Sequence, residues 1–302
     1  AVRPFAGERP IVLVVPVAVS AVLVAVAVSL AGRRDVGAGL VRPRPGPAEA
    51  VAALGTPLGL AWRLQRGSVV AWTSGVALLG GVMASVAESA DDIVGENEEI
   101  REYLASVAGA PLADLFLATI LLYVALLAAG HGVQAVLRAR TEETAGRTEA
   151  VLATGTGRSA WLGSHLAVGL GGAVTVLLVG AAAMGLVHGL VVGDLGQVPR
   201  LVGSGLALAP AVAVAVVAPV ALFGLRSSWG PAGWVVLVGA TLVAMFGDAL
   251  DLPDPLRRLS PFDHLAAAPA ETVRAVPLVV LTGVAGALVA VGFAGFARRD
   301  VG

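Results

Sequence analysis

The sequence lacks both cysteine and lysine over its 302 residues. Without cysteine it cannot form a disulfide, a thiolate metal site or a cysteine nucleophile. Without lysine it cannot form a P-loop, because that motif places a lysine on the nucleotide phosphates, and Schiff-base chemistry is excluded as well. All 20 basic residues are arginine, and a net charge of −1 offers no basic field to nucleic acid. Any ATP hydrolysis is therefore expected on another chain.

Charge of both signs is scarce, whereas apolar residues are abundant. Charged residues make up 14% of the chain, hydrophobic residues make up 57%, and the mean hydropathy is +0.87. Soluble domains carry about 25% charge and about 45–50% apolar residues. The apolar runs are continuous rather than alternating, which favours helices over a barrel. The composition predicts an all-α polytopic membrane protein.

Seven apolar stretches are long enough to cross a bilayer as helices. They are Ile11–Ala31, Ser68–Ala87, Ala113–Leu137, Leu162–His188, Leu201–Leu225, Gly233–Leu250 and Pro277–Phe296. If the spans alternate in direction, 13 of the 20 arginines lie on the side that carries the C-terminus. Arginine is enriched on the cytoplasmic side of membrane proteins. We therefore expect about seven spans and a cytoplasmic C-terminus.

The five-residue string R-R-D-V-G occurs twice, at 33–37 and at 298–302. Extended upstream without gaps, Val12–Gly37 and Pro277–Gly302 share 13 of 26 residues. We interpret the two copies as the closing helices of two tandem halves. Residues 1–40 then form the last span of a first half, and residues 67–302 form a complete six-span half. Roughly 230 residues of the first half are expected upstream of this chain.

The halves are joined by a proline-rich stretch, residues 41–57, which predicts an extended linker. Thr56 followed by Pro57 predicts a helix start. Residues 58–66 then read as an amphipathic elbow helix on the inner membrane face. The alternative is a simple extension of the following span. The residues expected at the membrane interface are Trp62, Arg63 and Arg66.

The longest polar stretch within the six-span half begins at Arg138 and follows its second span. Thr141 can cap a helix that runs to about residue 153, with acidic residues favourably placed in its first turn. Glu143 and Arg147 are spaced to pair on one face of such a helix. The stretch is either a rigid contact for a partner or a solvated connector.

The string E-E-x-x-G-R-x-E-A-V-L-A-T-x-x-x-R at 142–158 resembles the coupling-helix segment of ABC exporter permeases. P-L-G-L-A-W-R-L-Q-R-G, S-P-F-D-H-L and the paired R-R-D-V-G strings are similar to the polyketide-antibiotic (tetronasin-type) exporter branch. The resemblance implies that a coupling helix over about 141–153 docks into a cleft of an ATP-binding subunit. The residues implied in coupling are Glu142, Glu143, Gly146, Arg147, Glu149 and Leu152.

The resemblance further implies a permease of two tandem six-span halves in the bacterial cytoplasmic membrane. Two copies of an ATP-binding subunit would carry ATP and magnesium, so this chain would be neither an enzyme nor a holder of a cofactor. The implied function is outward transport of hydrophobic or amphiphilic small molecules, as in antibiotic or multidrug efflux. Two alternatives remain: export of a lipid or cell-envelope precursor, and a membrane sensor or enzyme without transport.

Few residues within the spans could carry chemistry. The four histidines show no metal-binding spacing, so no metal site and no catalytic residue is expected. His131 and Gln134 lie one turn apart near the end of a span, where they either line a pathway or form hydrogen bonds between helices. The scarcity of ionisable groups in the spans argues against a proton- or sodium-coupled carrier.

Overall fold

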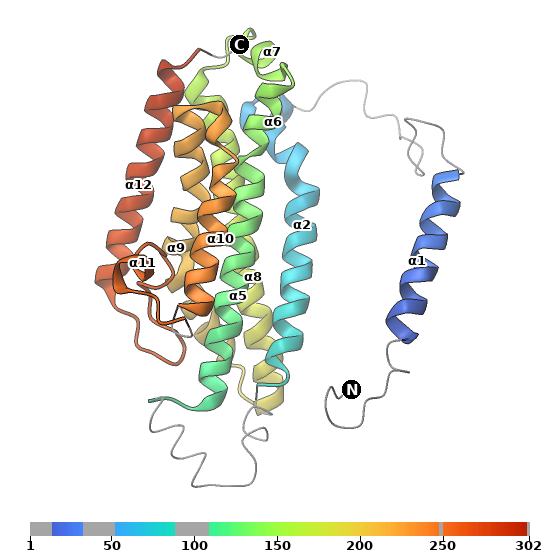
Figure 1. Cartoon of the computed structure of the whole chain (residues 1–302), viewed down its shortest axis with the longest axis vertical. Helices are drawn as coiled ribbons and strands as arrows, with labels where there is room; N and C mark the ends of the chain where they lie inside the picture. Colours follow the sequence, from blue (N-terminus) through green and yellow to red (C-terminus); the bar gives the residue numbers. More distant parts are fainter. Residues whose placement is uncertain (1–13, 33–51, 88–108, 248–249, 301–302) are drawn as a thin grey trace. The chain divides into compact units, whose positions relative to one another are not determined.

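The computed structural model describes residues 14–32, 52–87, 109–247 and 250–300. The chain forms two compact units, Ala1–Ala50 and Val51–Gly302, which are treated separately. All regular secondary structure in the described ranges is helical, which confirms the predicted fold class (Figure 1). The described part of the first unit is a single helix, α1 (Val14–Gly32), with no charged residue. It overlaps the first predicted span, of which residues 11–13 lie outside the described ranges, but over its described residues it is a shorter apolar helix that does not reach membrane-spanning length.

The described residues of the second unit contain six helices that are long and apolar enough to cross a membrane. They are α2 (Pro57–Ala84), α5 (Leu112–Val136), α8 (Arg158–Val192), α9 (Gln197–Leu225), α10 (Ala232–Phe246) and α12 (Ala275–Arg298). Shorter elements join them: η2 (Ala52–Gly55), α6 (Arg138–Thr144), α7 (Arg147–Leu152), η3 (Ser227–Trp229) and α11 (Asp254–Arg257). Each long helix matches one of the other six predicted spans.

Helices α8 and α9 form the centre of the bundle, and α5 packs against both (Figure 1). Helix α2 covers α8, α12 covers α9, and α10 lies against α9 and α5. At one end, Asp114 of α5 accepts a hydrogen bond from Arg200 of α9 at 2.7 Å. The opposite end carries α6, α7 and the end of α12. The bundle therefore has two polar ends of different construction.

Glycines let α9 and α12 cross with their backbones in contact. A Cβ at Gly224 would lie 2.0 Å from the carbonyl oxygen of Gly292, and one at Gly295 would lie 2.8 Å from the backbone of Gly224. Small residues allow this close approach between membrane helices. At Gly283 and Gly286, on the same helix, an added methyl group would have nothing within 4 Å. Only part of the glycine-rich surface of α12 is therefore a packing face.

The separate elbow helix over residues 58–66 is not observed. Helix α2 is unbroken from Pro57 to Ala84, so this stretch is the beginning of a span, as the alternative interpretation held. The reason is a buried face that includes Gln65 and continues past residue 66 through Val69 and Val76. The predicted start is confirmed, because Thr56 Oγ1 accepts a hydrogen bond from the Gly59 amide at 3.1 Å. Side chains on the first turns that are exposed include Trp62, Arg63 and Arg66.

Candidate functional site

The polar stretch between α5 and α8 lies at the same end of the bundle as the end of α12 (Figure 1). We call residues 138–157 the α6–α7 segment. Helix α6 continues α5 through Leu137, whose backbone is right-handed helical. Thr141 lies inside α6 and donates to the Leu137 carbonyl, so it does not cap a helix as predicted. The segment is therefore rigidly continuous with a membrane span.

The single helix predicted over 141–153 is wrong, because Gly146 divides it into α6 and α7. Gly146 has φ 68°, in the left-handed region. Residues with a side chain rarely adopt this conformation, whereas glycine does so without strain. Gly146 follows Glu142 and Glu143 within one helical turn, and a glycine in such a position is a sequence signal for the end of a helix.

Gly146→Ala is expected to destabilise the segment by about 1 kcal/mol, the cost of the left-handed conformation for alanine. Gly146→Asn should cost less, because asparagine tolerates this region. The matched control is Gly157→Ala, where φ is −66° and nothing lies within 4 Å of the added methyl group. Hydrogen exchange of the α6–α7 amides measures the difference. Equal hydrogen exchange in the Gly146→Ala and Gly157→Ala variants would contradict the left-handed conformation assigned to Gly146.

Glu142 holds α6 and α7 together. Its carboxylate accepts hydrogen bonds from Arg138 Nε at 2.9 Å and from Arg147 Nη2 at 3.1 Å, with Arg147 Nε also in contact. The Glu142 side chain is only 11% exposed. The hydrogen bond from Arg147 holds the pKa of the Glu142 carboxyl below its usual range. The predicted Glu143–Arg147 pair is wrong, because that spacing requires a continuous helix and the turn at Gly146 directs Arg147 to Glu142 instead.

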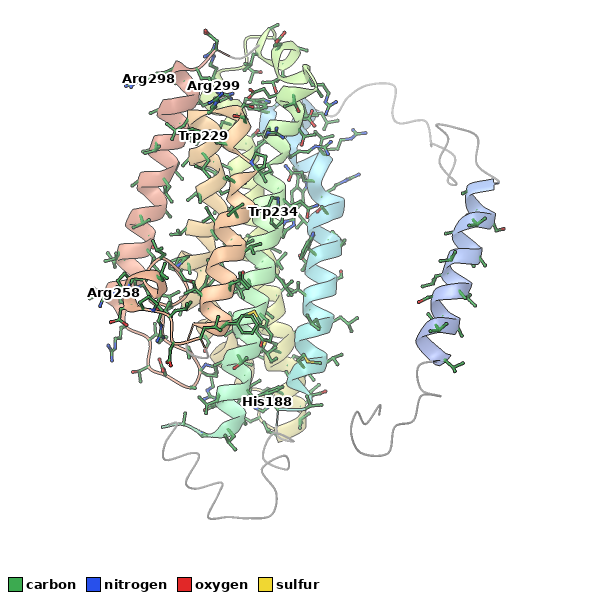
Figure 2. The ribbon with its side chains drawn as sticks, viewed as in Figure 1. His188, Trp229, Trp234, Arg258, Arg298 and Arg299 are labelled. Carbon is green, nitrogen blue, oxygen red and sulfur yellow. The ribbon has the colours of Figure 1, made fainter. Side chains whose placement is uncertain are left out.

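Glu143 pairs with Arg299, at the end of α12. The two carboxylate oxygens accept from Arg299 Nη1 and Nη2 at 2.7 and 2.6 Å. Both side chains are largely buried, at 13% and 16% exposed. Arg299 belongs to the second R-R-D-V-G string, which the sequence marked as a repeat without assigning it a role. Figure 2 shows Arg298 and Arg299 at this end of α12, and Arg298 is exposed.

The aromatic rings beneath Arg299 come from α9 and α12. Its guanidinium carbon lies 4.8 Å from the ring centre of Phe223 and 5.2 Å from that of Phe296. Arg158, in the first turn of α8, donates to the Arg299 carbonyl at 2.7 Å. Arg140 of α6 donates to the Ser227 carbonyl at 3.1 Å. The base of the α6–α7 segment is thus bound to several neighbouring elements.

The six residues predicted for coupling fall into two groups. Glu142 and Glu143 are turned inward into ion pairs, and Leu152 is half-buried. Gly146, Arg147 and Glu149 are exposed. We call the exposed residues around the turn and on α7 the tip of the segment: Thr144, Ala145, Gly146, Arg147, Glu149, Ala150 and Ala153. The segment therefore combines an anchored base with an exposed tip.

His131 and Gln134 take different positions. His131 is fully buried, and a Cβ at Gly172 of α8 would lie 2.6 Å from its Nε2. Gln134 is exposed and accepts a hydrogen bond from Trp72 of α2 at 3.1 Å. It lines a cleft of about 360 Å³ between α2, α5 and α10, together with Arg138 and Trp234. Of this predicted pair, only Gln134 faces an open space among the described helices.

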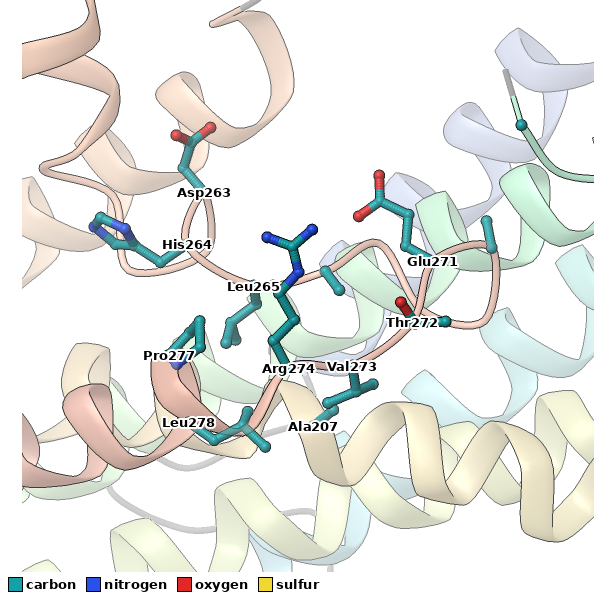
Figure 3. Close-up of a pocket in the computed structure, with 13 residues that line it drawn as sticks. Ala207, Asp263, His264, Leu265, Glu271, Thr272, Val273, Arg274, Pro277 and Leu278 are labelled. Atoms are coloured by element: carbon teal, nitrogen blue, oxygen red, sulfur yellow. The ribbon is translucent and has the colours of Figure 1, made fainter. Parts of the chain in front are cut away.

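A cavity of about 610 Å³ lies at the opposite end of the bundle (Figure 3). Arg274 points into it between the carboxylates of Asp263 and Glu271, and Leu278 of α12 forms part of its apolar wall. The described residues contain no group of three or more side chains that could hold a metal ion. The two ends of the bundle thus each carry a cavity.

In the part of the chain that the structure describes, six membrane-length helices with a rigid polar segment between two of them define a polytopic membrane protein. Residues 54–297 match the family described as "Multidrug efflux system permease Rv1217c, C-terminal domain", and the chain belongs to that family. It is 40% identical to the multidrug efflux system permease protein Rv1217c of Mycobacterium tuberculosis (strain ATCC 25618 / H37Rv), over 99% of this chain. The match covers 55% of that protein, so this chain spans about half the length of its relative.

Proposed function

We propose that this chain is the C-terminal half of the permease of an ATP-driven ABC exporter, acting in the bacterial cytoplasmic membrane. The observation that carries the proposal is the α6–α7 segment, whose tip is exposed, whose two helices are held together by Glu142 and whose base is bound to the end of α12 by Glu143. A protein that receives a push from a partner needs both features. The excess of arginine at this end supports a cytoplasmic position for it.

The exposed tip is the contact for the ATP-binding subunit, which supplies ATP, magnesium and hydrolysis. Two copies of that subunit would serve the two permease halves, and the N-terminal half would belong to the same full-length chain. Closure of the subunits on ATP would displace the tip. Because α6 continues α5 and α7 leads into α8, the displacement passes directly into two membrane helices.

The exported compounds are hydrophobic or amphiphilic small molecules, as the name of the efflux permease relative supports. The cleft beside Gln134 has a volume of about 360 Å³, within the range of small-molecule sites. It combines amide, indole and guanidinium groups with apolar walls, which suits an amphiphile taken up from the inner side. The cavity of about 610 Å³ at the opposite end is the corresponding candidate for release.

The test replaces two exposed tip residues in the full-length protein, as Glu149→Arg with Ala150→Trp. We expect the ATP-binding subunit to be lost from the purified complex, because the reversed charge and the added bulk face the docking cleft. Co-purification and ATP hydrolysis are measured together. The matched control is Asp254→Arg, an exposed residue of α11 at the opposite end.

A folded tip variant that still co-purifies with the subunit and supports normal hydrolysis would refute docking through this surface. Unchanged thermal unfolding shows that the variant is folded. The Asp254→Arg control is expected to co-purify normally.

A further inference from the structure

We propose that Arg299 is a positioning residue that makes the end of α12 move together with the α6–α7 segment. On this proposal, which rests on the proposed function, α12 is a third helix displaced when the tip is pushed. Helices α5 and α8 follow the segment because they are covalently continuous with it. Helix α12 follows because Glu143 binds Arg299.

The Glu143–Arg299 pair is unusual in what it connects. Among the described residues it is the one ion pair that joins the α6–α7 segment to a helix other than α5 and α8. The partners are 156 positions apart in the chain. Two parallel hydrogen bonds between a guanidinium and a carboxylate fix both distance and orientation, which a single contact does not. When Glu143 moves, α12 therefore moves with it, because the Arg299 side chain cannot rotate to absorb the movement.

The surroundings of Arg299 restrict its side chain further. Its guanidinium lies over the rings of Phe223 and Phe296, and Trp161 of α8 stacks on Phe296 at 5.5 Å. A cation shielded from water in this way interacts more strongly with both the rings and the carboxylate. Arg158 holds the backbone carbonyl of Arg299 from the first turn of α8. The side chain and the backbone of this one residue are thus bound from three other helices.

The displacement can continue beyond α12. Gly224 of α9 lies against the backbone of Gly292, so α9 and α12 cannot move apart without breaking this backbone contact. Helix α9 is the most buried of the candidate spans. A push received at Glu143 thus reaches the centre of the bundle by a route that bypasses α5 and α8.

The internal repeat supports a role beyond helix packing. In the alignment of the two copies, Gly292 corresponds to Ala27 and Gly295 to Leu30, so the close-packing glycines are not repeated. The charged string R-R-D-V-G is repeated without change. The repeat of this string is therefore independent of the glycines that form the α9–α12 contact.

The first experiment compares Arg299→Gln, Glu143→Gln and their combination in the full-length protein with its ATP-binding subunit. Ethidium efflux from vesicles is expected to fall about tenfold in each single variant, the change that corresponds to losing one charge-assisted contact. Co-purification and ATP hydrolysis are expected to persist, because the tip is untouched. The double variant should be no worse than either single variant, since both remove the same contact. The control is Arg298→Gln at the neighbouring residue, which is exposed, and we expect it to leave ethidium efflux unchanged.

The second experiment uses the absence of cysteine from this chain. Glu143→Cys and Arg299→Cys are introduced together, with any cysteine elsewhere in the full-length protein replaced by serine. We expect the unlinked double variant to hydrolyse ATP but transport ethidium poorly. Joining the two thiols with a short bifunctional maleimide should restore transport, because the link replaces the ion pair. If the Glu143–Arg299 pair only stabilised the fold, its loss would change thermal unfolding, and cross-linking would not restore ethidium transport.

Normal ethidium efflux in Arg299→Gln would overturn the proposal, as would failure of the cross-link to restore transport. Loss of transport on cross-linking would likewise overturn it, because the pair would then have to open during the cycle. These results differ from failure of the proposed function itself. In that case the wild-type protein would neither retain the ATP-binding subunit nor export ethidium.

Discussion

Gly224→Ala is expected to destabilise the bundle by about 2 kcal/mol or more, in the range of overpacked cores. The added methyl carbon would lie 2.0 Å from the Gly292 carbonyl oxygen and 2.7 Å from its Cα. These are backbone atoms, so no side chain can rotate away and the two helices must separate. Alanine is intrinsically the better helix former by about 1 kcal/mol, which offsets only part of the clash.

Gly286→Ala provides the matched control on the other helix of this pair. Nothing lies within 4 Å of the methyl group that it adds to α12. We expect it to leave the thermal unfolding midpoint unchanged or to raise it slightly, through the same gain in helix propensity. Thermal unfolding of both variants in one detergent measures the difference. Equal midpoints would mean that α9 and α12 are not in backbone contact.

The spans could be predicted from the sequence because each is decided locally. In a bilayer every backbone group must be satisfied within its own helix, so an apolar run of sufficient length becomes a span. The predicted stretch Ala113–Leu137 differs by only one residue at each end from α5. The elbow helix was predicted wrongly because its polar and aromatic residues suggested an end where the buried face of α2 continues. The outward charges alone do not terminate a helix.

The site could be predicted only in part. The resemblance located the α6–α7 segment, and the residues chosen within it do meet at one end of the bundle. The partner of Glu143 was assigned by helical spacing to Arg147, whereas it is Arg299, which tertiary packing brings from the far end of the chain. No local rule connects positions so distant. The sequence did contain one indirect signal, since an arginine of the repeated string that becomes buried on folding needs an acidic partner, as Arg299 does.

Removal of the Glu142 carboxylate is the second change with a large expected effect. Glu142→Ala leaves Arg138 and Arg147 facing each other without their shared acceptor. We expect a loss of about 2 kcal/mol in local stability, as for hydrogen bonds to a charged group. Transport should fall along with it, because α7 is no longer held against α6 and the tip can yield when pushed. Hydrogen exchange of the α6–α7 amides and ethidium efflux measure the two effects.

Glu149→Ala is the matched control on the same segment, since Glu149 is exposed. Its effect on local stability is expected to stay within about 0.5 kcal/mol, as at ordinary surface positions.

The dependence on pH distinguishes the Glu142 ion cluster from simple packing. Because the folded-state pKa of Glu142 is lowered, its stabilisation is fully present above the ordinary carboxyl pKa of about 4.3. It is lost as the pH falls through the lowered value, where the carboxylate is protonated and no longer attracts the two guanidinium groups. The difference between wild type and Glu142→Ala should therefore be constant near neutral pH and shrink in acid. A difference that stays constant into strong acid would show that the alanine variant loses packing rather than charge.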